Sequence, residues 1–147
     1  MTFTHPIVRQ ACMEDCKLIY GFVCELEEWD FDYSIFENLY RRNLNNPENI
    51  YLVAEVNGFL SGYISCHGQF LLHHGGRVFE IQELYVAPEF RSNGIGQLLV
   101  QNLESALSLF DYRSLEVTAH KKREKTHDFY LKMGFHFTHL KFTKDKI

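Results

Sequence analysis

Apolar and polar positions alternate along the chain with two periods, and each change of period marks the boundary of an element. Apolar residues at three- and four-residue spacing are typical of helices with one buried side. This spacing predicts helices over Glu14–Glu28, from Ser34 to about Asn45, from Ile95 to Phe110 and over Lys125–Met133. Short runs rich in β-branched and aromatic residues predict strands over Ile7–Arg9, Ile50–Val56, Phe59–His67, Val78–Val86, Ser114–Ala119 and Phe135–Phe142.

Turn and capping residues support these boundaries. Ser34 and Glu37 have the spacing of a capping box, which predicts that Ser34 opens the second helix. Asn57-Gly58 between two strands is the strongest short signal for a β-hairpin, because both positions tolerate a positive φ. Gly134 follows the last helix at the position where a glycine commonly ends one. The chain is therefore expected to alternate strands and helices around one sheet.

The stretch from Leu84 to Gly96 links a predicted strand to a predicted helix through a turn with two glycines. A proline breaks the strand, and Gly94 and Gly96 remove side chains where the backbone would approach a ligand. Free N–H groups in the first turn of the following helix point toward an anion placed there. Arg91 adds a charged donor. This glycine turn, Arg91–Gly96, predicts a pyrophosphate site.

Two other glycine-rich phosphate loops do not fit the glycine turn. A P-loop needs Lys and then Ser or Thr after its second glycine, where this chain has Gln97 and Leu98. The dinucleotide fingerprint needs a third glycine, where Leu99 stands. The remaining pattern is Arg-x-x-Gly-x-Gly after Val-x-Pro-x-Phe, followed downstream by Phe-Tyr-Leu-Lys-Met-Gly-Phe at 129–135. Together, in this order, the two patterns resemble the motifs of the GNAT superfamily of N-acetyltransferases.

The GNAT resemblance implies a fold and a cofactor. The implied fold is a mixed α/β (α+β) domain over residues 1–147, with a central sheet of about six to seven strands flanked by about four helices. The resemblance also implies that acetyl-CoA binds at the end of the fourth strand and at the glycine turn. The expected coenzyme contacts are Leu84, Tyr85, Val86, Arg91, Ser92, Asn93, Gly94, Ile95, Gly96 and Arg123.

Length, charge and cysteine usage fit one compact enzyme domain. The chain has 147 residues and a formal net charge of −4, which leaves no strongly basic surface for nucleic acid. No apolar run approaches the roughly 18 residues of a membrane helix, and a signal-peptide core is lacking, so the cytoplasm is the expected compartment. Cys12, Cys16, Cys24 and Cys66 form no Cys-x-x-Cys pair, and we expect reduced thiols.

An amine acceptor poses a protonation problem. A primary amine with a pKa near 10 is free base in only about one molecule in a thousand at pH 7, and only the free base attacks a thioester. Glu80 and Glu83 on the predicted fourth strand are candidate bases, and on a regular strand they would point to opposite faces. The family resemblance favours Glu80, because the base often lies about eleven positions before the arginine of the glycine turn. Glu83 is the second candidate, and its alternative roles are to hold the end of the strand or to contact the substrate.

The departing coenzyme A thiolate is better expelled if it receives a proton. Tyr130 matches the general acid of the GNAT motif, whereas the phenylalanines around it are expected to pack in the core. The resemblance also implies that a backbone N–H near Leu84 or Tyr85 stabilises the oxyanion. The chain departs from the family at Arg123, where many members have Asn. With the lysines beside it, Arg123 is a candidate contact for coenzyme phosphates, and a solvated charge run is the alternative.

Further segments resemble the bacterial aminoalkylphosphonate N-acetyltransferase family. The similarity lies at Gln69–His74, Glu80–Leu84, His127 and His139–Lys144. That family acetylates small aminophosphonates and depends on a divalent metal, so His73, His74 and Glu80 become a candidate ligand set of imidazole and carboxylate type. The alternative is that two adjacent histidines on a loop tip face solvent and bind nothing.

The expected function is an acetyl-CoA-dependent N-acetyltransferase that transfers the acetyl group directly, in a ternary complex, to a small amine such as an aminoalkylphosphonate. Arg77, Lys141 and His139 are candidates for pairing with the acid group of that acceptor. Amino acids, polyamines and protein or peptide amines remain alternatives, and a non-catalytic acyl-CoA sensor is disfavoured by the presence of Tyr130 and Glu80. The expected partners are acetyl-CoA and the amine, without nucleic acid or membrane. Whether the chain forms a homodimer is left open.

Overall fold

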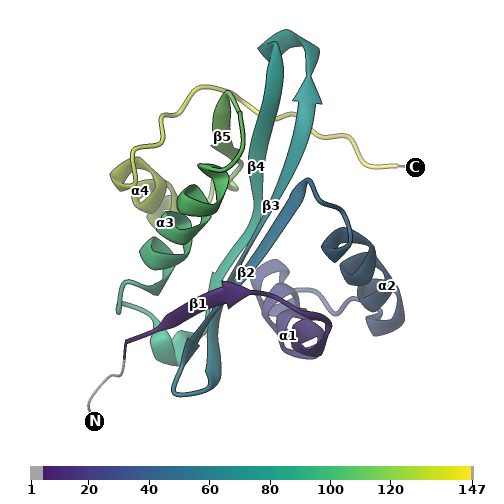
Figure 1. Ribbon diagram of the computed structural model, residues 1–147, viewed down its shortest axis with the longest axis vertical. Helices are drawn as coiled ribbons and strands as arrows, with labels where there is room; N and C mark the ends of the chain where they lie inside the picture. The colour runs from purple at the N-terminus through teal and green to yellow at the C-terminus, as the bar shows by residue number, and fades with distance from the viewer. Residues whose placement is uncertain (1–4, 147) are drawn as a thin grey trace.

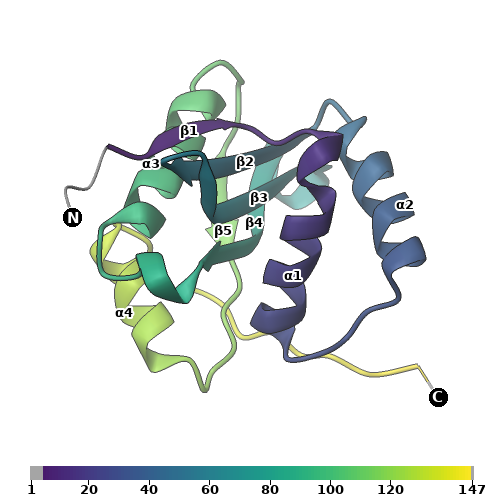
Figure 2. The same cartoon turned by 90° about the horizontal axis from the view of Figure 1, so that it is seen from below.

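The computed structural model describes residues 5–146 and places a five-stranded sheet between two pairs of helices (Figures 1 and 2). The strands are β1 (Ile7–Gln10), β2 (Asn49–Val56), β3 (Phe59–Leu71), β4 (Gly76–Val86) and β5 (Ser114–Val117). They lie in chain order, and all neighbours are antiparallel except β4 and β5, which are parallel. The mixed α+β fold is as expected, with five strands instead of six to seven.

The helices cover the two faces of the sheet in pairs. The first pair is α1 (Cys16–Glu27) and α2 (Tyr33–Leu44), and the second is α3 (Ile95–Leu107) and α4 (Glu124–Lys132). Figure 2 shows the two pairs on opposite sides of the strands, which defines an α1/α2 face and an α3/α4 face. Short 3-10 helices lie at Met13–Asp15, Leu72–His74 and Pro88–Phe90.

The second helix starts earlier than the capping pattern predicted. Its N-cap is Asp32, whose Oδ1 accepts a hydrogen bond from the Ile35 N–H at 2.9 Å. Ser34, the predicted cap, lies inside the first turn. Both residue types are good caps, so two of them two positions apart leave the start undetermined, and the earlier one opens the helix here.

The two hairpins of the sheet differ in how well their turns were predicted. Asn57 and Gly58 connect β2 to β3 with φ angles of 53° and 80°, which confirms the Asn-Gly hairpin. The hairpin of β3 and β4 extends beyond the predicted strand ends to a tip at Leu72–His74, where Gly75 has a φ of 67°. The longer pairing carries β3 and β4 well above the level of the other strands (Figure 1).

The predicted last strand, Phe135–Phe142, is wrong. The chain after α4 forms no further helix or strand up to residue 146, and it runs as an extended trace past the β5 edge of the sheet (Figures 1 and 2). Alternating side chains indicate that a segment can be a strand, but a strand also needs a neighbour with which to share hydrogen bonds. No such neighbour pairs with this segment among the described residues.

The main core lies on the α3/α4 face. The apolar stripe of α3 packs there as its spacing predicted, with Ile95, Leu99, Val100, Leu103 and Leu107 buried. These side chains meet apolar residues from β2, β3 and β4, which alternate with residues of the other face. The packing of α3 against the sheet fixes the glycine turn at the end of β4.

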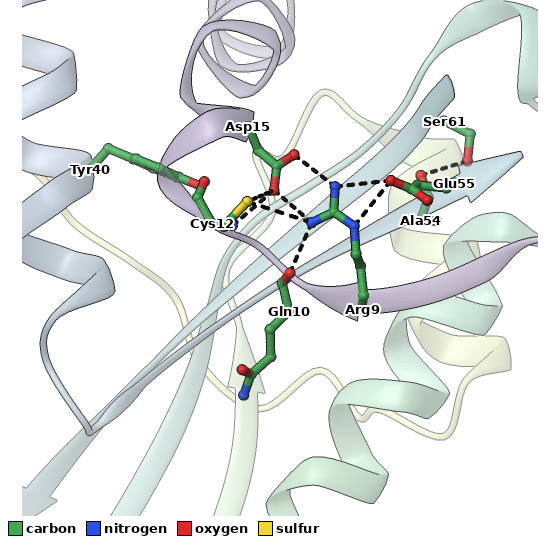
Figure 3. A network of polar contacts seen from close by, with 8 residues as sticks. All are labelled: Arg9, Gln10, Cys12, Asp15, Tyr40, Ala54, Glu55 and Ser61. Carbon is green, nitrogen blue, oxygen red and sulfur yellow. Dashed lines mark hydrogen bonds and ion pairs between the residues drawn. The ribbon is translucent and has the colours of Figure 1, made fainter. Parts of the chain in front are cut away.

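A polar network joins the edge strand β1 to β2 and to the residues before α1 (Figure 3). Arg9 of β1 forms two bonds of 2.8 Å to the carboxylate of Asp15, and its Nε lies 3.0 Å from Glu55 of β2. Asp15 is 5% exposed and also accepts from the Cys12 N–H at 2.8 Å. Burial opposes the charge of Asp15, but the bonds from Arg9 and Cys12 outweigh it and lower the pKa of the carboxyl. The network fixes the entry into α1.

Candidate active site

A one-residue bulge in β4 decides the direction of the two candidate bases. Pairing with β3 runs to Ile81 and resumes at Glu83, so Gln82 is an extra residue. Glu80 and Glu83 pair with β3 residues that are two positions apart, and such residues share a face. Both glutamates therefore point to the α1/α2 face. The expectation of opposite faces, which holds for a regular strand, is wrong because the bulge shifts the alternation by one residue.

Glu83 is held by two hydroxyl groups of β3. Its Oε1 accepts from Tyr63 Oη at 2.9 Å and from Ser65 Oγ at 2.5 Å. Burial raises the pKa of the Tyr63 phenol well above its usual value, so Tyr63 remains a donor. Tyr63 and Ser65 are 2% and 0% exposed, which makes them rigid partners. Among the described residues Oε2 has no hydrogen bond, and this oxygen can contact a ligand.

Glu80 is more loosely held than Glu83. It accepts from Gln82 Nε2 at 3.2 Å and from Thr118 Oγ1 at 3.4 Å. Its neighbour across the strands is His67, whose Nε2 lies 2.6 Å from the Tyr51 hydroxyl. Burial lowers the pKa of His67, more than the nearby glutamates raise it. At neutral pH His67 is therefore uncharged beside a carboxylate.

The last part of β4 has a strand on one side only. The parallel pairing with β5 covers Val78–Ile81, so residues 82–86 have β3 beside them and no second strand in the described chain. Backbone groups of Leu84 and Tyr85 that point away from β3 can therefore serve a ligand.

Tyr85 ties the end of β4 to α1. Its hydroxyl donates to the Glu25 carboxylate of α1, and its ring packs against Phe22 with centroids 5.0 Å apart. Burial, and next the charge of Glu25, raise the pKa of Tyr85 to about 12. Next to this contact, an open hollow of about 240 Å³ is lined by Cys24, Glu25, Glu28, Trp29 and Asp30. The hollow is acidic and has one exposed aromatic ring.

The glycine turn joins β4 to α3 as the sequence predicted, and two of its residues have positive φ angles. Gly94 caps α3 with a φ of 77°, and Ser92 has a φ of 65°. A Cβ added at Gly94 would meet no atom within 4 Å, so the glycine is required by its backbone angle while the space beside it is free. Asn93 Nδ2 donates to the carbonyls of Phe90 and Arg91, at 3.1 and 3.0 Å, and closes the turn.

Arg91 precedes Gly94 and the first turn of α3 follows it. Arg91 Nε donates to the Val86 carbonyl at 2.9 Å, and the guanidinium lies over the Tyr85 ring, 5.5 Å from its centroid. The first N–H groups of α3 have no partner inside the helix. A Cβ added at Gly96 would lie 3.5 Å from the ring of Phe129 in α4, which is an ordinary contact, so packing alone does not require this glycine. Helix and arginine thus form a site suited to an anion.

Tyr130 is buried in α4 on the α3/α4 side. It is 7% exposed and packs edge-on against Phe129 and Phe135, with ring centroids 5.2 and 5.3 Å away. Burial raises the pKa of Tyr130 to about 12, so the phenol keeps its proton at neutral pH. Its hydroxyl forms no hydrogen bond with another described residue. The group is therefore available as a proton donor.

The candidate metal ligands are not brought together. His73 and His74 lie at the tip of the β3–β4 hairpin with ring centroids 4.5 Å apart, and His74 Nε2 is 3.8 Å from Glu116 Oε2 in β5. Glu80 lies within the paired part of β4. Between residues 5 and 146, no three His, Cys, Asp or Glu side chains are grouped to hold a metal ion. These residues do not fit the expected ligand set, and no catalytic step is derived through a metal.

Two arginines with expected ligand roles are engaged in structural contacts. Arg77 points to the α3/α4 side, where its Nε lies 3.0 Å from Glu48 Oε2 and its guanidinium stacks 4.7 Å from the Phe70 ring. It is therefore not placed to pair with an acceptor on the other face. Arg123 donates to the Leu26 carbonyl at 2.7 Å, which ties the start of α4 to the end of α1. Its guanidinium is directed at α1, so it is not placed to contact a coenzyme phosphate.

The polar residues of β3 were not predicted as part of the site. Tyr63, Ser65 and His67 occupy alternate positions, and they line the α1/α2 face next to Glu83 and Glu80. The signal was present, because three hydrogen-bonding side chains alternate there with apolar ones in a strand that is otherwise buried. Strand periodicity would have placed them together on one face.

Comparisons with known proteins agree with this geometry. The sequence matches the profile described as "Acetyltransferase (GNAT) family" over residues 17–135. It is 37% identical to the aminoalkylphosphonate N-acetyltransferase of Salmonella typhimurium, over 93% of this chain and 89% of that protein. A transcriptional regulator from Bacillus halodurans C-125 has a TM-score of 0.89 at 17% identity, covering 97% of this chain and 100% of that one.

A second solved structure, an aminoglycoside N-acetyltransferase in complex with CoA, has a TM-score of 0.87 at 15% identity and covers 99% of this chain and 97% of that one. At these identities the two structures are evidence for the fold alone. No helix within the described residues is long and apolar enough to cross a membrane.

Proposed function

The chain belongs to the acetyltransferase (GNAT) family of acyltransferases, and we propose that it transfers the acetyl group of acetyl-CoA directly to the primary amine of a small acceptor, in a ternary complex. The observation that carries this proposal is the glycine turn, which joins the end of β4, paired there with β3 alone, to the first turn of α3 beside a free space. We propose residues 1–147 as one acetyltransferase domain.

The coenzyme would bind along the end of β4 and the glycine turn. The N–H groups of the turn and of the first turn of α3 would hold the pyrophosphate, with Arg91 as the charged donor. Leu84–Val86 would present backbone groups to the pantetheine arm and to the thioester, because that side of β4 has no strand. The proposed contacts in the turn are Arg91, Ser92, Asn93, Gly94, Ile95 and Gly96.

Glu80 would solve the protonation problem of the acceptor. Its carboxylate has two long hydrogen bonds and lies on the same face as Glu83, so it is the less constrained of the two bases. It would take a proton from the ammonium of the acceptor, directly or through water, and so produce the free base. Glu83, held by Tyr63 and Ser65, would orient the amine through its second oxygen.

Acetyl transfer then exchanges one bond at the carbonyl carbon for another. The amine nitrogen attacks, the C–N bond forms, and the carbonyl oxygen becomes an oxyanion that a backbone N–H near Leu84 or Tyr85 would stabilise. Collapse of this intermediate breaks the C–S bond, the nitrogen gives its extra proton to solvent, and the tyrosinate left by the proton transfer from Tyr130 regains a proton from solvent. Tyr130 would give its proton to the departing thiolate, which its high pKa of about 12 allows without loss of that proton beforehand.

The first candidate acceptor is an aminoalkylphosphonate. Support comes from the relative of that name, which is 37% identical over nearly the whole length of both chains. Of the residues expected to pair with the acid group of this acceptor, Arg77 is bound to Glu48, so His139 and Lys141 remain the candidates.

The second candidate acceptor is a cationic amine such as a diamine or polyamine. The hollow beside Tyr85 favours it, because three carboxylates and the Trp29 ring suit a second ammonium group. A panel of amines with acetyl-CoA, read by thiol release, separates the two candidates. Fastest turnover of an aminoalkylphosphonate supports the first, and fastest turnover of a diamine supports the second.

Replacement of Gly94 tests the coenzyme site. Gly94→Asp places an anion in the proposed pyrophosphate site, so acetyl-CoA affinity by calorimetry should fall by at least about a hundredfold, as like charges disfavour each other. Gly75→Asp is the matched control, because Gly75 has a similar φ of 67° and equally free surroundings at the distant hairpin tip. The control should bind normally with the same loss of stability. Normal binding by Gly94→Asp would contradict the assignment.

A further inference from the structure

His67 of β3 is a partly buried imidazole whose two ring nitrogens have different surroundings. Its Nε2 lies 2.6 Å from the hydroxyl of Tyr51, whereas its Nδ1 has no hydrogen bond with any described residue. Tyr51 is 7% exposed, and its ring lies against those of Tyr40 and His67, with centroids 6.0 and 5.7 Å away. A buried and well-packed hydroxyl therefore holds the imidazole at one of its two nitrogens.

The bond to Tyr51 decides which nitrogen of His67 carries the proton. Burial raises the pKa of the Tyr51 phenol and lowers the pKa of His67, so at neutral pH the phenol is protonated and the imidazole is neutral. A neutral imidazole has one donor and one acceptor nitrogen, and the acceptor nitrogen is a stronger base than a phenol oxygen. Tyr51 therefore donates to Nε2, and the proton of the ring lies on Nδ1.

The Nδ1–H group of His67 belongs to the part of the sheet that holds the two candidate bases. His67 pairs with Glu80 across β3 and β4, and the charges of Glu80 and Glu83 both act on its imidazole. The other side-chain donors around these carboxylates already have acceptors. Tyr63 and Ser65 donate to Glu83, and Gln82 and Thr118 donate to Glu80. The Nδ1–H is thus a donor that no acceptor in the described chain uses.

A donor in this position suits the acid group of an acceptor. Glu80, Glu83 and Glu116, which lies opposite Glu80 on β5, would repel an anionic group that had no donor of its own. Side chains directly opposite each other on antiparallel strands have Cβ atoms about 4.5–5.5 Å apart, so one small molecule can reach both Glu80 and His67. We propose that the Nδ1–H of His67 binds an oxygen of the acceptor's acid group while the amine lies at Glu80, and that Tyr51 fixes the ring in the form that can do so. This role rests on the acetyl transfer proposed above.

Two replacements of His67 place an amide N–H at different ring positions. The amide nitrogen of Asn can take the place of Nδ1, and that of Gln can take the place of Nε2. With aminomethylphosphonate and acetyl-CoA, His67→Gln should raise the KM of the amine on the order of tenfold, with kcat within about threefold of wild type, because a hydrogen bond to a charged group is lost. His67→Asn is the matched control and should keep the KM within about threefold of wild type. A fall in kcat at unchanged KM, or equal effects of the two replacements, overturns the proposal.

Ethylamine separates recognition of the acid group from support of Glu80. It has no acid group, so His67→Gln should leave its kcat/KM within about threefold of wild type. A loss as large as that with aminomethylphosphonate would mean that His67 acts on the base, and it overturns the proposal. If the wild type acts on aminomethylphosphonate alone, the separate changes in KM and kcat decide.

The wild-type chain also separates failure of this proposal from failure of the proposed function. Acetylation of ethylamine without acetylation of aminomethylphosphonate overturns the role of His67 and leaves acetyl transfer standing. No thiol release with any amine contradicts the proposed function, and the role of His67 with it.

Tyr51→Phe tests the position of the proton without changing His67. Loss of the hydroxyl frees Nε2, so the ring can place its proton on either nitrogen, and the KM for aminomethylphosphonate should rise severalfold because fewer molecules have the form that binds. Tyr40→Phe is the matched control, since Tyr40 is buried in the same cluster and its hydroxyl donates to the Cys12 carbonyl at 2.7 Å. The control should keep the KM of the wild type.

NMR of the chain with isotope-labelled histidine gives a readout that does not depend on activity. The wild type should show the proton of His67 on Nδ1, with the signal assigned by its absence in His67→Asn. In Tyr51→Phe the same signal should move toward a mixture of the two forms. A wild-type proton on Nε2 overturns the proposal whatever the kinetics show.

Discussion

The two faces of the sheet are built from opposite kinds of side chain. The α3/α4 face holds a cluster of aliphatic and phenyl groups around Phe79, Ile81 and Leu103, all at most 3% exposed. The α1/α2 face holds tyrosines with polar partners: Tyr63 with Glu83, and the hydroxyl of Tyr51 with an imidazole. The named side chains of the first face and the two tyrosines of the second are buried, but only the second face fixes the direction of its side chains by hydrogen bonds.

This difference assigns different tasks to the faces. Apolar burial is non-directional and stabilises the fold roughly in proportion to area, so the α3/α4 face supports the position of the glycine turn. Hydrogen bonds depend on direction, so the α1/α2 face can hold carboxylates in a fixed orientation toward an acceptor. We therefore expect substitutions on the first face to change mainly the free energy of unfolding. Substitutions on the second should change mainly turnover and substrate binding.

Tyr130 is the sharpest exception to this comparison, since it lies in the apolar cluster and is proposed as the general acid. Tyr130→Phe keeps the ring and removes the hydroxyl, so kcat should fall by about 10²–10⁴ while the unfolding free energy changes little. Because the pKa of Tyr130 is about 12, this group should cause no loss of kcat between pH 7 and 9. Tyr112→Phe, at a tyrosine packed against the same cluster, is the control. A kcat within about threefold of wild type would make Tyr130 a core residue only.

Glu80→Gln tests whether the polar face carries the base. The amide cannot accept the proton, so kcat should fall by about a hundredfold and the acidic limb of the pH–rate profile should disappear. Glu83→Gln keeps a group that can bond Tyr63 and Ser65, and we expect a rise in KM with a smaller change in kcat. The opposite result would exchange the two roles.

Phe79→Ala should have the largest effect on stability. Phe79 is 0% exposed in the cluster, and removal of its ring should lower the unfolding free energy by about 3–5 kcal/mol, measured by urea denaturation. Phe59→Ala is the matched control in a strand, because Phe59 is 70% exposed and its loss should stay within about 0.5 kcal/mol. Equal losses in both variants would contradict the description of the α3/α4 face as the main core.

Tyr63→Phe should have a smaller effect on stability than Phe79→Ala, and it tests the polar face directly. Loss of one hydroxyl that donates to Glu83 should cost about 1 kcal/mol in unfolding free energy, since the ring stays in place. The KM for the amine should rise severalfold, because Glu83 keeps only Ser65 as a partner. An unchanged KM would show that this bond has a structural role alone.

The sequence predicted most of what local chemistry decides. Asn57-Gly58 set the first hairpin because few other residues accept its backbone angles. The stripe of α3 was correct because a helix forms its own hydrogen bonds, and its buried side then follows from spacing alone. The turn at Gly94 was also predicted, because the backbone angle at the start of a helix depends on nearby residues.

Features that depend on a distant partner were not predicted. The predicted last strand failed because alternation from Phe135 to Phe142 does not supply a neighbour. The directions of Glu80 and Glu83 failed because a bulge depends on pairing with β3. Arg77 was expected at the acceptor, but its partner Glu48 lies 29 positions earlier in the chain and could not be inferred from nearby residues. Each of these errors concerns a contact that the fold, rather than the local sequence, selects.

The bulge at Gln82 also limits which mutations this site can accept during evolution. A point substitution alters which group stands at a position of β4, but it leaves that position on the same side of the sheet. Gain or loss of a single codon at Gln82 would move every side chain of one half of the strand to the other side, exchanging Glu83 with the apolar neighbour Leu84. Related sequences should therefore tolerate a substitution in β4 more readily than a change in the number of residues between Glu80 and the glycine turn.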